Sequence, residues 1–458
     1  MKELLLKIAQ KLGIDKAIAF TSGNGVINAV IGVVSVFIYT TCISKEEQGY
    51  LYTFNSVMAI KVFFELGFTG IITQYVAHEH AHLNWAEDGV GLLGEDKYKS
   101  RLSSLLHFCM KWYSVIAIVY FIVLQVAGIY FFSTFGRDDS VSWKIPWIFI
   151  SLFSAIGLFQ APIFSFTKGL GLVKEMAEMG FYVTIVSTLV SWGCFIYGFA
   201  LYSIIISSFI STLYSLYYFF NHKLFKIIVS IWRIKVTEKV SYMKEIFPFQ
   251  WRIALSWISG YFIFNFINPV VFATSGAVAA GQMGMTVNIL NQIRSFAMAW
   301  IGTKVPLMSR MIALKDYLQL DRLFKKTVLQ ELFIAVSLLL IFWCCIFVLR
   351  LTQLSINGRI VAERFLDYLP MLLMTIPVIA QMINDNLATY LRCHKREPYL
   401  LKSVCIGLLS VCYILICSKY FGLIGICTGY CIIFTLISLP WGIIIFAHKR
   451  KEWHGRLI

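Results

Sequence analysis

Long apolar runs separated by short polar segments dominate the hydropathy pattern along all 458 residues of the chain. Each run is long enough to cross the hydrocarbon core of a bilayer as a helix, which takes about 20 apolar residues. The predicted fold class is therefore all-α integral membrane, with about twelve transmembrane helices. The predicted helices cover residues 17–42, 50–77, 106–133, 145–167, 179–199, 201–221, 248–274, 281–309, 327–349, 367–390, 399–418 and 423–447.

The longest connection between apolar runs, residues 222–247, divides the twelve predicted helices into two groups of six. This division predicts an N-terminal lobe at 17–221 and a C-terminal lobe at 248–447, arranged around a central cavity as in transporters built from internal repeats. Residues 1–16 alternate leucine and isoleucine with lysine, which is typical of an amphipathic helix on an anionic membrane surface. Residues 448–458 are predicted to be a polar tail.

The composition excludes a water-soluble protein, because 59% of the residues are apolar and only 14% are charged. Soluble proteins carry about 25% charged residues. The formal charge of +16 therefore does not indicate a nucleic-acid partner. Of the 40 Lys and Arg residues, 28 fall in the alternate segments that include both ends of the chain, and only 7 fall on the opposite side. The positive-inside rule then predicts that both termini and the connector are cytoplasmic.

The motifs of several common chemistries are absent from the sequence. It has no phosphate-binding loop for ATP and no paired CxxC motif among its eleven cysteines, so no cofactor and no metal are expected. The segment His78-Glu79-His80-Ala81-His82 could hold a metal, but it lies at the end of a predicted helix, where we expect solvated side chains. We expect the same of the outer acidic pairs Glu46/Glu47 and Asp138/Asp139.

Polar side chains inside the apolar runs are the informative positions, because an ionisable group at bilayer depth costs about 2.5–3.5 kcal/mol on insertion scales. In the second predicted helix one helical face carries Asn55, Lys61, Glu65, Thr69 and Thr73. Lys61 and Glu65 are four residues apart and can form an ion pair. Alternatively, Lys61 contacts a ligand and Glu65 takes part in ion coupling.

The eighth predicted helix has a second polar face, which contains Asn291 and Arg294 together with Asn288, Gln292 and Ser295. Arg294 has no acidic neighbour on its own helix, so it must find an anion elsewhere, and its planar fork of donors suits a phosphate. The tenth helix carries Asp385, which we expect to be the one lone acid in a predicted span. Asp385 can pair with Arg392 or titrate as part of ion coupling.

Two further helices contribute candidate contacts. Arg252 lies one turn inside the seventh predicted helix and is either an interfacial anchor or a ligand contact. Asn28 lies on a polar face of the first predicted helix. Together these residues predict a water-filled, positively charged cleft whose ligand is an anion.

Two segments resemble the oligosaccharide flippases of the multidrug/oligosaccharidyl-lipid/polysaccharide exporter superfamily. The stretch Ser44–Ala77 contains SKEEQGYLYTF followed by FELGFTGIITQYVA, and the end of the eighth helix reads VPLMSRMIALKDYLQLDRLFKK. The resemblance implies a translocase that moves a polyprenyl-diphosphate-linked oligosaccharide across the bacterial cytoplasmic membrane by alternating access. It also implies membrane lipids and the glycosyltransferases or polymerase of one pathway as partners, and an ion gradient or membrane potential as the energy source.

Within this resemblance Lys61, Arg294 and Arg252 would bind the diphosphate, while Asn28 and Asn291 would meet sugar hydroxyls. Glu65 and Asp385 are candidates for ion coupling. Two alternatives stay open: a cation-coupled drug exporter of the same superfamily, and a membrane enzyme acting on lipid-linked sugars. The exporter should have a net acidic cavity, and the enzyme should have an acid/base constellation at one membrane face, which the sequence lacks.

The charge distribution predicts which loops are accessible from outside the cell. After removal of the native cysteines, single cysteines placed at 135–143 or 353–363 should react with an impermeant thiol reagent added to intact cells, because both segments lie on the sparsely charged side. Cysteines placed at 226–244 should react only after lysis. Labelling of 226–244 in intact cells would reverse the predicted topology.

Overall fold

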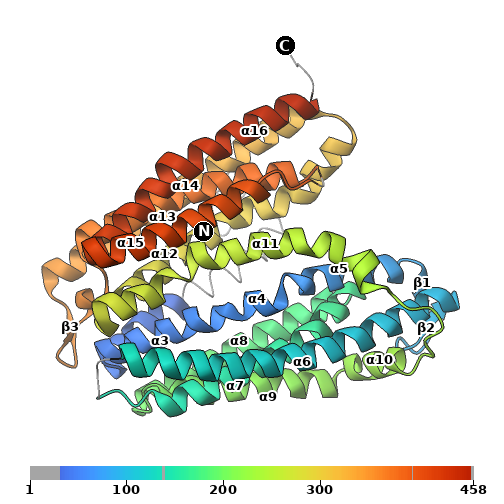
Figure 1. Ribbon diagram of the computed structural model, residues 1–458, viewed down its shortest axis with the longest axis horizontal. Helices are drawn as coiled ribbons and strands as arrows, with labels where there is room; N and C mark the ends of the chain where they lie inside the picture. The colour runs from blue at the N-terminus through green and yellow to red at the C-terminus, as the bar shows by residue number, and fades with distance from the viewer. Residues whose placement is uncertain (1–30, 137–139, 395, 455–458) are drawn as a thin grey trace, which may run out of the picture. The chain divides into compact units, whose positions relative to one another are not determined.

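The computed structural model describes residues 31–136, 140–394 and 396–454, and these residues fold almost entirely as helices (Figure 1). Contacts group the described residues into two compact units. One unit is Phe54–Tyr261, and the other combines the residues up to Thr53 with those from Phe262 onward. These boundaries fall within helices and not in the connector 222–247, and the expected division into two six-helix lobes stays a prediction.

The unit Phe54–Tyr261 is built from long helices joined by short connections, in which α6 packs on α7 and α8 packs on α9 (Figure 1). Its elements are the 3-10 helix η1 (Ala59–Lys61), α4 (Val62–Glu65), α5 (Phe68–His80), β1 (Leu83–Trp85), β2 (Leu92–Gly94), α6 (Asp96–Phe135), α7 (Lys144–Gly169), α8 (Val173–Ile196), α9 (Tyr202–Asn221), α10 (Lys223–Trp232) and the π-helix η2 (Tyr242–Ile246). The two helices that cross the unit boundaries are α3 (Lys45–Met58) and α11 (Phe247–Phe264).

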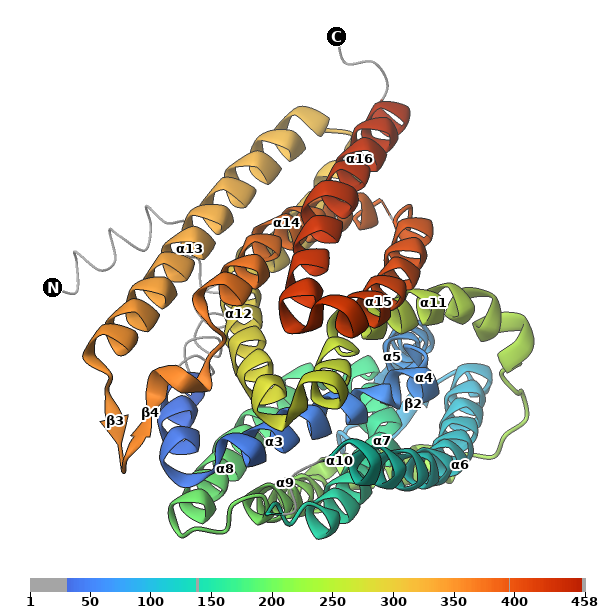
Figure 2. The same ribbon diagram turned by 60° about the vertical axis from the view of Figure 1, so that its left-hand side comes forward.

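The other unit contains the first described helix, Ile31–Cys42, and the C-terminal helices (Figure 2). Helix α13 ends in the short antiparallel hairpin β3–β4. The C-terminal elements are α12 (Ile267–Ala313), α13 (Tyr317–Thr352), β3 (Ser355–Ile356), β4 (Arg359–Ile360), the 3-10 helix η3 (Val361–Arg364), α14 (Tyr368–Arg392), α15 (Leu400–Ile432), the π-helix η4 (Ile433–Ser438) and α16 (Leu439–His454).

Membrane-spanning helices account for most of the described chain. Among the described residues, eight helices are long and apolar enough to cross a bilayer, and the bent pair Lys45–Glu65 and Phe68–His80 makes a ninth. Two of the eight, Gln250–Ala313 and Leu400–His454, contain a non-helical glycine, Gly276 or Gly422, and each covers two of the predicted spans. The shorter apolar helix Ile31–Cys42 falls within the first predicted span. The prediction of an all-α multi-pass membrane protein is confirmed.

The second predicted span is broken, although the sequence pattern predicts a continuous helix over 50–77. Helix α4 ends at Glu65, and both Leu66 (φ 51°) and Gly67 (φ 68°) adopt the left-handed conformation before α5 begins. The two halves meet at 45°. Glycine adopts positive φ without steric cost, and a Cβ at Gly67 would lie 2.5 Å from the side chain of Ile253. The break therefore needs glycine for both its conformation and its packing.

The connector 222–247 is not a simple charged loop, because it contains a helix and is hydrogen-bonded to α6. Its first part forms α10, whose apolar side chains Leu224, Ile227 and Ile231 are buried. Its second part is held by the first turns of α6, where Ser100 Oγ accepts hydrogen bonds of 2.8 Å from the backbone N–H groups of residues 237 and 238. Helix α6 is long enough to reach the connector outside the membrane, because its 40 residues, at about 1.5 Å each, extend well beyond a hydrocarbon core of about 30 Å.

Helix α3 approaches α12 closely through two glycines. A Cβ at Gly49 would lie 2.0 Å from the carbonyl oxygen of Ala277, and a Cβ at Gly281 would lie 2.9 Å from the backbone nitrogen of Gly49. Small residues at such a crossing let two backbones come together inside a membrane. The contact is fixed by Gln48, whose Nε2 donates to the carbonyl oxygen of Gly281 at 2.9 Å.

The start of α3 is closed by a capping box. The backbone N–H of Glu47 donates to Ser44 Oγ at 3.0 Å, and the backbone N–H of Ser44 donates to Glu47 Oε2 at 2.7 Å. Glu47 is therefore a helix cap, whereas the sequence pattern predicts a solvated loop end. Asp138 and Asp139 lie outside the described residues.

A buried arginine caps the end of the first described helix. Arg364, which is only 1% exposed, donates from Nη2 to the carbonyl oxygens of Thr40 (3.0 Å) and Ile43 (2.6 Å). Its Nη1 donates to Gln48 Oε1 at 3.2 Å. Arg359 adds hydrogen bonds to the carbonyl oxygens of Thr41 (3.0 Å) and Ile43 (2.7 Å). Residues from the 350–366 segment thus satisfy the free carbonyls of a helix more than 300 residues earlier.

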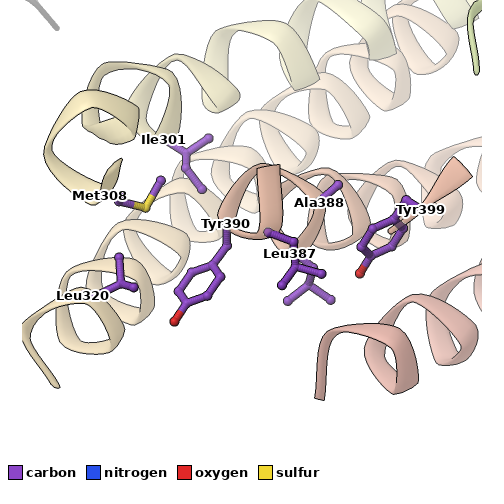
Figure 3. Close-up of a cluster of buried hydrophobic side chains, with 8 residues drawn as sticks. Ile301, Met308, Leu320, Leu387, Ala388, Tyr390 and Tyr399 are labelled. Atoms are coloured by element: carbon purple, nitrogen blue, oxygen red, sulfur yellow. The ribbon is translucent and has the colours of Figure 1, made fainter. Parts of the chain in front are cut away.

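At the opposite end of this unit a hydrophobic cluster holds α12, α13 and α14 together (Figure 3). Its buried members are Ile301, Met308, Leu320, Leu387, Ala388, Tyr390, Leu391 and Tyr399. Tyr390 also donates to Asp321 Oδ1 on α13 at 2.7 Å, which satisfies its hydroxyl. One face of α14 is thereby fixed to its neighbours.

The capping arginine generates a stability prediction. Arg364→Ala should lower the free energy of unfolding by about 3 kcal/mol, because it leaves buried carbonyl groups without a donor and opens a cavity. The matched control Arg359→Ala should cost only about 1 kcal/mol, since Arg359 is half-buried and Arg364 still caps Ile43. Denaturant unfolding of the purified protein in detergent micelles measures both. Equal losses from the two variants would contradict the assigned role of Arg364.

Candidate functional site

A cavity of about 640 Å³ lies between α12 and α14. Both helices belong to the unit that contains Phe262 onward. The residues that line the cavity are Phe264, Asn291, Arg294, Ser295, Met298, Ala299, Asp385, Thr389 and Arg392. Two guanidinium groups and a single carboxylate therefore line this cavity, together with small hydroxyl and amide groups.

An ion pair across the cavity joins the two helices. Arg294 Nη2 contacts Asp385 Oδ2, and Arg294 Nη1 donates to Gln381 Oε1 at 3.4 Å. The guanidinium also lies over the ring of Phe264, 5.2 Å from its centroid, which adds a cation–π contact. Asp385 is thus the anion that Arg294 needs, and both side chains stay partly exposed, at 18% for Arg294 and 35% for Asp385.

The spacing of polar residues on α14 explains how one helix lines the cavity. Gln381, Asp385, Thr389 and Arg392 follow one another at intervals of four, four and three residues, so they share one helical face. The opposite face carries the hydrophobic cluster of Figure 3. Among the candidate spans of the described chain, α14 is the most enclosed, with 67% of the residues in its most apolar stretch buried.

Of the two alternatives for Asp385, pairing with Arg392 is wrong. Arg392 donates to both carboxylate oxygens of Glu397, at 2.6 and 3.1 Å. Glu397 follows five residues later, beyond the end of α14 at Arg392. Asp385 instead pairs with Arg294, which lies 91 residues earlier in the sequence.

The remaining predicted site residues lie elsewhere. Lys61 is exposed at the end of η1, and Glu65 accepts a hydrogen bond from Thr69 Oγ1. No ion pair joins Lys61 to Glu65 in the part of the chain that the structure describes. Arg252 is exposed beside the ring of Trp251, at 5.5 Å from its centroid. Asn28 lies outside the described residues, and Asn291 lines the cavity with Arg294.

The structure adds two buried charged residues that the sequence pattern does not single out. Lys402, which is 5% exposed, donates to Asn384 Oδ1 at 2.6 Å. Glu331 on α13 is fully buried within the predicted span 327–349. The expectation that Asp385 is the one lone acid in a span is therefore wrong. Glu331 was identifiable as a charged residue at the start of an apolar run.

The side chains of the His78–His82 segment point to different partners. Glu79 accepts a hydrogen bond of 3.1 Å from Arg101, while His82 stacks on Tyr98 and His80 lies against Trp85. Among the described residues, no group of three His, Cys, Asp or Glu side chains could hold a metal ion. The expectation that this segment binds no metal stays a prediction.

Glu245, in the connector, contacts Arg101, the same arginine that binds Glu79. It thereby links the connector to α5 and α6. It accepts hydrogen bonds from Tyr75 (2.5 Å) and Arg101 (2.6 Å). Burial raises the pKa of Glu245, but these hydrogen bonds and the charge of Arg101 outweigh it and lower the pKa from 4.5 to about 2. The carboxylate is therefore charged at neutral pH and holds the connector in place.

The fold matches solved membrane transporters over nearly the whole chain. An inward-facing multidrug resistance MATE family transporter of the MOP superfamily superposes with a TM-score of 0.67 at 13% identity, covering 92% of this chain and 96% of that chain. The lipid II flippase MurJ, in an inward closed conformation, gives 0.59 at 14% identity, covering 95% and 88%. A point mutant of the Vibrio cholerae MATE transporter VcmN gives 0.57 at 12% identity, covering 98% of both chains. The chain therefore shares the fold of these transporters.

The family follows from the sequence itself. A family model described as polysaccharide biosynthesis protein matches residues 14–312, which is more than half of the chain. The chain belongs to this polysaccharide biosynthesis family. No curated protein matches it.

The ion pair in the cavity can be tested by a double-mutant cycle. Arg294→Gln and Asp385→Asn should each lower the free energy of unfolding by about 2–3 kcal/mol, because each leaves a partly buried charge without its partner. The double variant should be more stable than the sum of the two losses by about 2 kcal/mol. Denaturant unfolding in micelles at constant pH measures the cycle. A coupling energy near zero would mean that the two side chains do not pair.

Proposed function

We propose that the protein is a flippase that moves a polyprenyl-diphosphate-linked oligosaccharide, such as an O-antigen or capsule repeat unit, across the bacterial cytoplasmic membrane. The membership in a polysaccharide biosynthesis family and the transporter fold support this class of function. The single observation that carries the substrate assignment is the cavity with Arg294 and Arg392 on its walls. A planar guanidinium binds phosphate oxygens through two parallel hydrogen bonds.

The proposed mechanism is alternating access. A diphosphate-sugar head cannot cross hydrocarbon unaided, because its charges and hydroxyls lose their hydration there. Arg294 would bind the diphosphate, and Asn291, Ser295 and Thr389 would contact sugar hydroxyls. The polyprenyl chain would stay in the lipid. Lys61 and Arg252 are proposed as further phosphate contacts, and Asn28 as a further sugar contact.

Energy would come from an ion gradient or the membrane potential, and both termini are proposed to be cytoplasmic. Glu65 and Asp385 are the acids that the sequence offers for ion coupling. Lipids and the glycosyltransferases or polymerase of the same pathway are the proposed partners.

A cation-coupled drug exporter is the second candidate, because the solved structures that match the fold include multidrug transporters. A cavity for a cationic drug should carry more acid than base. The cavity between α12 and α14 has the opposite balance, which favours an anionic head group.

The deciding experiment substitutes Arg294. Arg294→Ala should abolish surface glycan display in a deletion strain complemented at matched membrane abundance. Arg294→Lys keeps the charge but loses the bidentate contact, so we expect partial display, with a loss of about 1.5–3 kcal/mol in substrate binding. The measurement is the amount of surface glycan per inserted transporter.

The matched control is Arg310→Ala, which removes an exposed arginine from the last turn of the same helix, outside the cavity. It should leave display unchanged. Full display from Arg294→Ala would exclude the cationic-cavity hypothesis and favour the drug exporter.

A further inference from the structure

Glu331 is an acidic residue enclosed in the helix bundle, away from the cavity described above. It is 0% exposed and lies on α13. Its Oε1 accepts a hydrogen bond of 3.2 Å from Asn386 Nδ2 on α14. Its other oxygen, Oε2, is buried and has no hydrogen-bond partner among the described residues, and the same is true of Asn386 Oδ1.

These surroundings disfavour an ionised carboxylate. Burying a carboxylate without a counter-ion costs far more than one hydrogen bond from a neutral amide can offset. The charged group of α14 that acts electrostatically on Glu331 is Asp385, which carries the same sign. The described residues give Glu331 no cationic partner, because Arg294 pairs with Asp385 and Lys402 donates to Asn384.

We propose that Glu331 is a proton-binding site of the transporter, occupied in the conformation described here and emptied in another conformation of the transport cycle. The proton adds to Oε2 and leaves the carboxyl neutral, while Oε1 keeps its hydrogen bond from Asn386. This inference rests on the proposed transport function, and it adds a coupling residue distinct from Glu65 and Asp385.

A proton fits this site better than a metal cation. A hard cation such as Ca²⁺ takes six to eight oxygen ligands. The free oxygens here are one from Glu331 and one from Asn386, and no group of metal-binding side chains gathers among the described residues. A proton needs only one of these oxygens, Oε2 of Glu331.

Helix α14 connects the proton site to the cavity. Asn386 contacts Glu331, and the adjacent residue, Asp385, contacts Arg294. Loss of the proton would place a second negative charge near Asp385 and would favour a conformation in which Glu331 reaches water. A ligand selects the conformation that binds it better, so proton occupancy would shift the packing of α13 on α14 and, with it, the geometry around Arg294.

The direct test is infrared difference spectroscopy of the purified protein in lipid nanodiscs at acidic and alkaline pH. We expect a carboxylic acid C=O band that disappears on deprotonation, that is lost in Glu331→Gln, and that persists in Asp385→Asn. The matched control Glu87→Gln, at an exposed loop position, should keep the band. Persistence of the whole band in Glu331→Gln would overturn the proposal.

Asn386→Ala provides a second test that does not depend on folding of the Glu331 variant. It removes the hydrogen bond to the carboxyl group, so the band should shift to higher frequency without being lost. An unshifted band would contradict the assignment. Replacing choline chloride by sodium chloride at constant pH should leave the band unchanged, and its loss in sodium would identify a metal-cation site instead.

Hydrogen exchange tests the conformational consequence. After correction for the intrinsic pH dependence, exchange in α13 and α14 should be faster at alkaline pH in the wild type and independent of pH in Glu331→Gln. Equal pH responses would overturn the coupling. Infrared spectroscopy and hydrogen exchange do not use the lipid-linked substrate. If Arg294→Ala leaves glycan display unchanged while the Glu331 carboxylic acid band behaves as expected, only the substrate assignment is rejected.

Discussion

The structure of the C-terminal helices depends on how polar side chains find partners where water is absent. In hydrocarbon each buried polar group must be satisfied by the protein itself, and α14 supplies most of these partners. Successive turns of α14 place Asp385 against Arg294, Asn386 against Glu331 and Asn384 against Lys402. These contacts reach α12, α13 and α15 in turn. A helix that carries so many polar residues can cross the membrane only at the centre of a bundle, which agrees with its high burial.

The end of this unit at which α3 begins gives a physical reason for the motif Ser44–Tyr50. Ser44 and Glu47 start the helix, Gln48 binds the carbonyl oxygen of Gly281, and Gly49 lets α12 approach. Ser44, Glu47, Gln48 and Gly49 each make a specific contact, so these positions of the motif are explained by helix capping and packing.

The helices could be predicted from the sequence because hydropathy is a local property, whereas the partners of the charged residues could not. Arg392 lies seven residues from Asp385, yet Asp385 pairs with Arg294, 91 residues away. Which of two arginines an acid meets depends on how the helices pack, and no local pattern encodes that packing. The break at Leu66–Gly67 was missed for a similar reason, since glycine is also common in continuous transmembrane helices. Asn291 and Arg294 were predicted together because one helical face already brings them together.

The ion pair in the cavity also bears on how the proposed flippase could release its cargo. Asp385 pairs with the guanidinium that the proposed diphosphate substrate would need, so this substrate would have to displace an internal carboxylate. Binding is then weaker than the arginine alone would give, by the free energy of the displaced pair. For a transporter this is useful, because a site that held the diphosphate too tightly would not release it on the other side. A conformational change that moves α14 relative to α12 would alter this competition, so the same two residues can favour loading in one state and release in another.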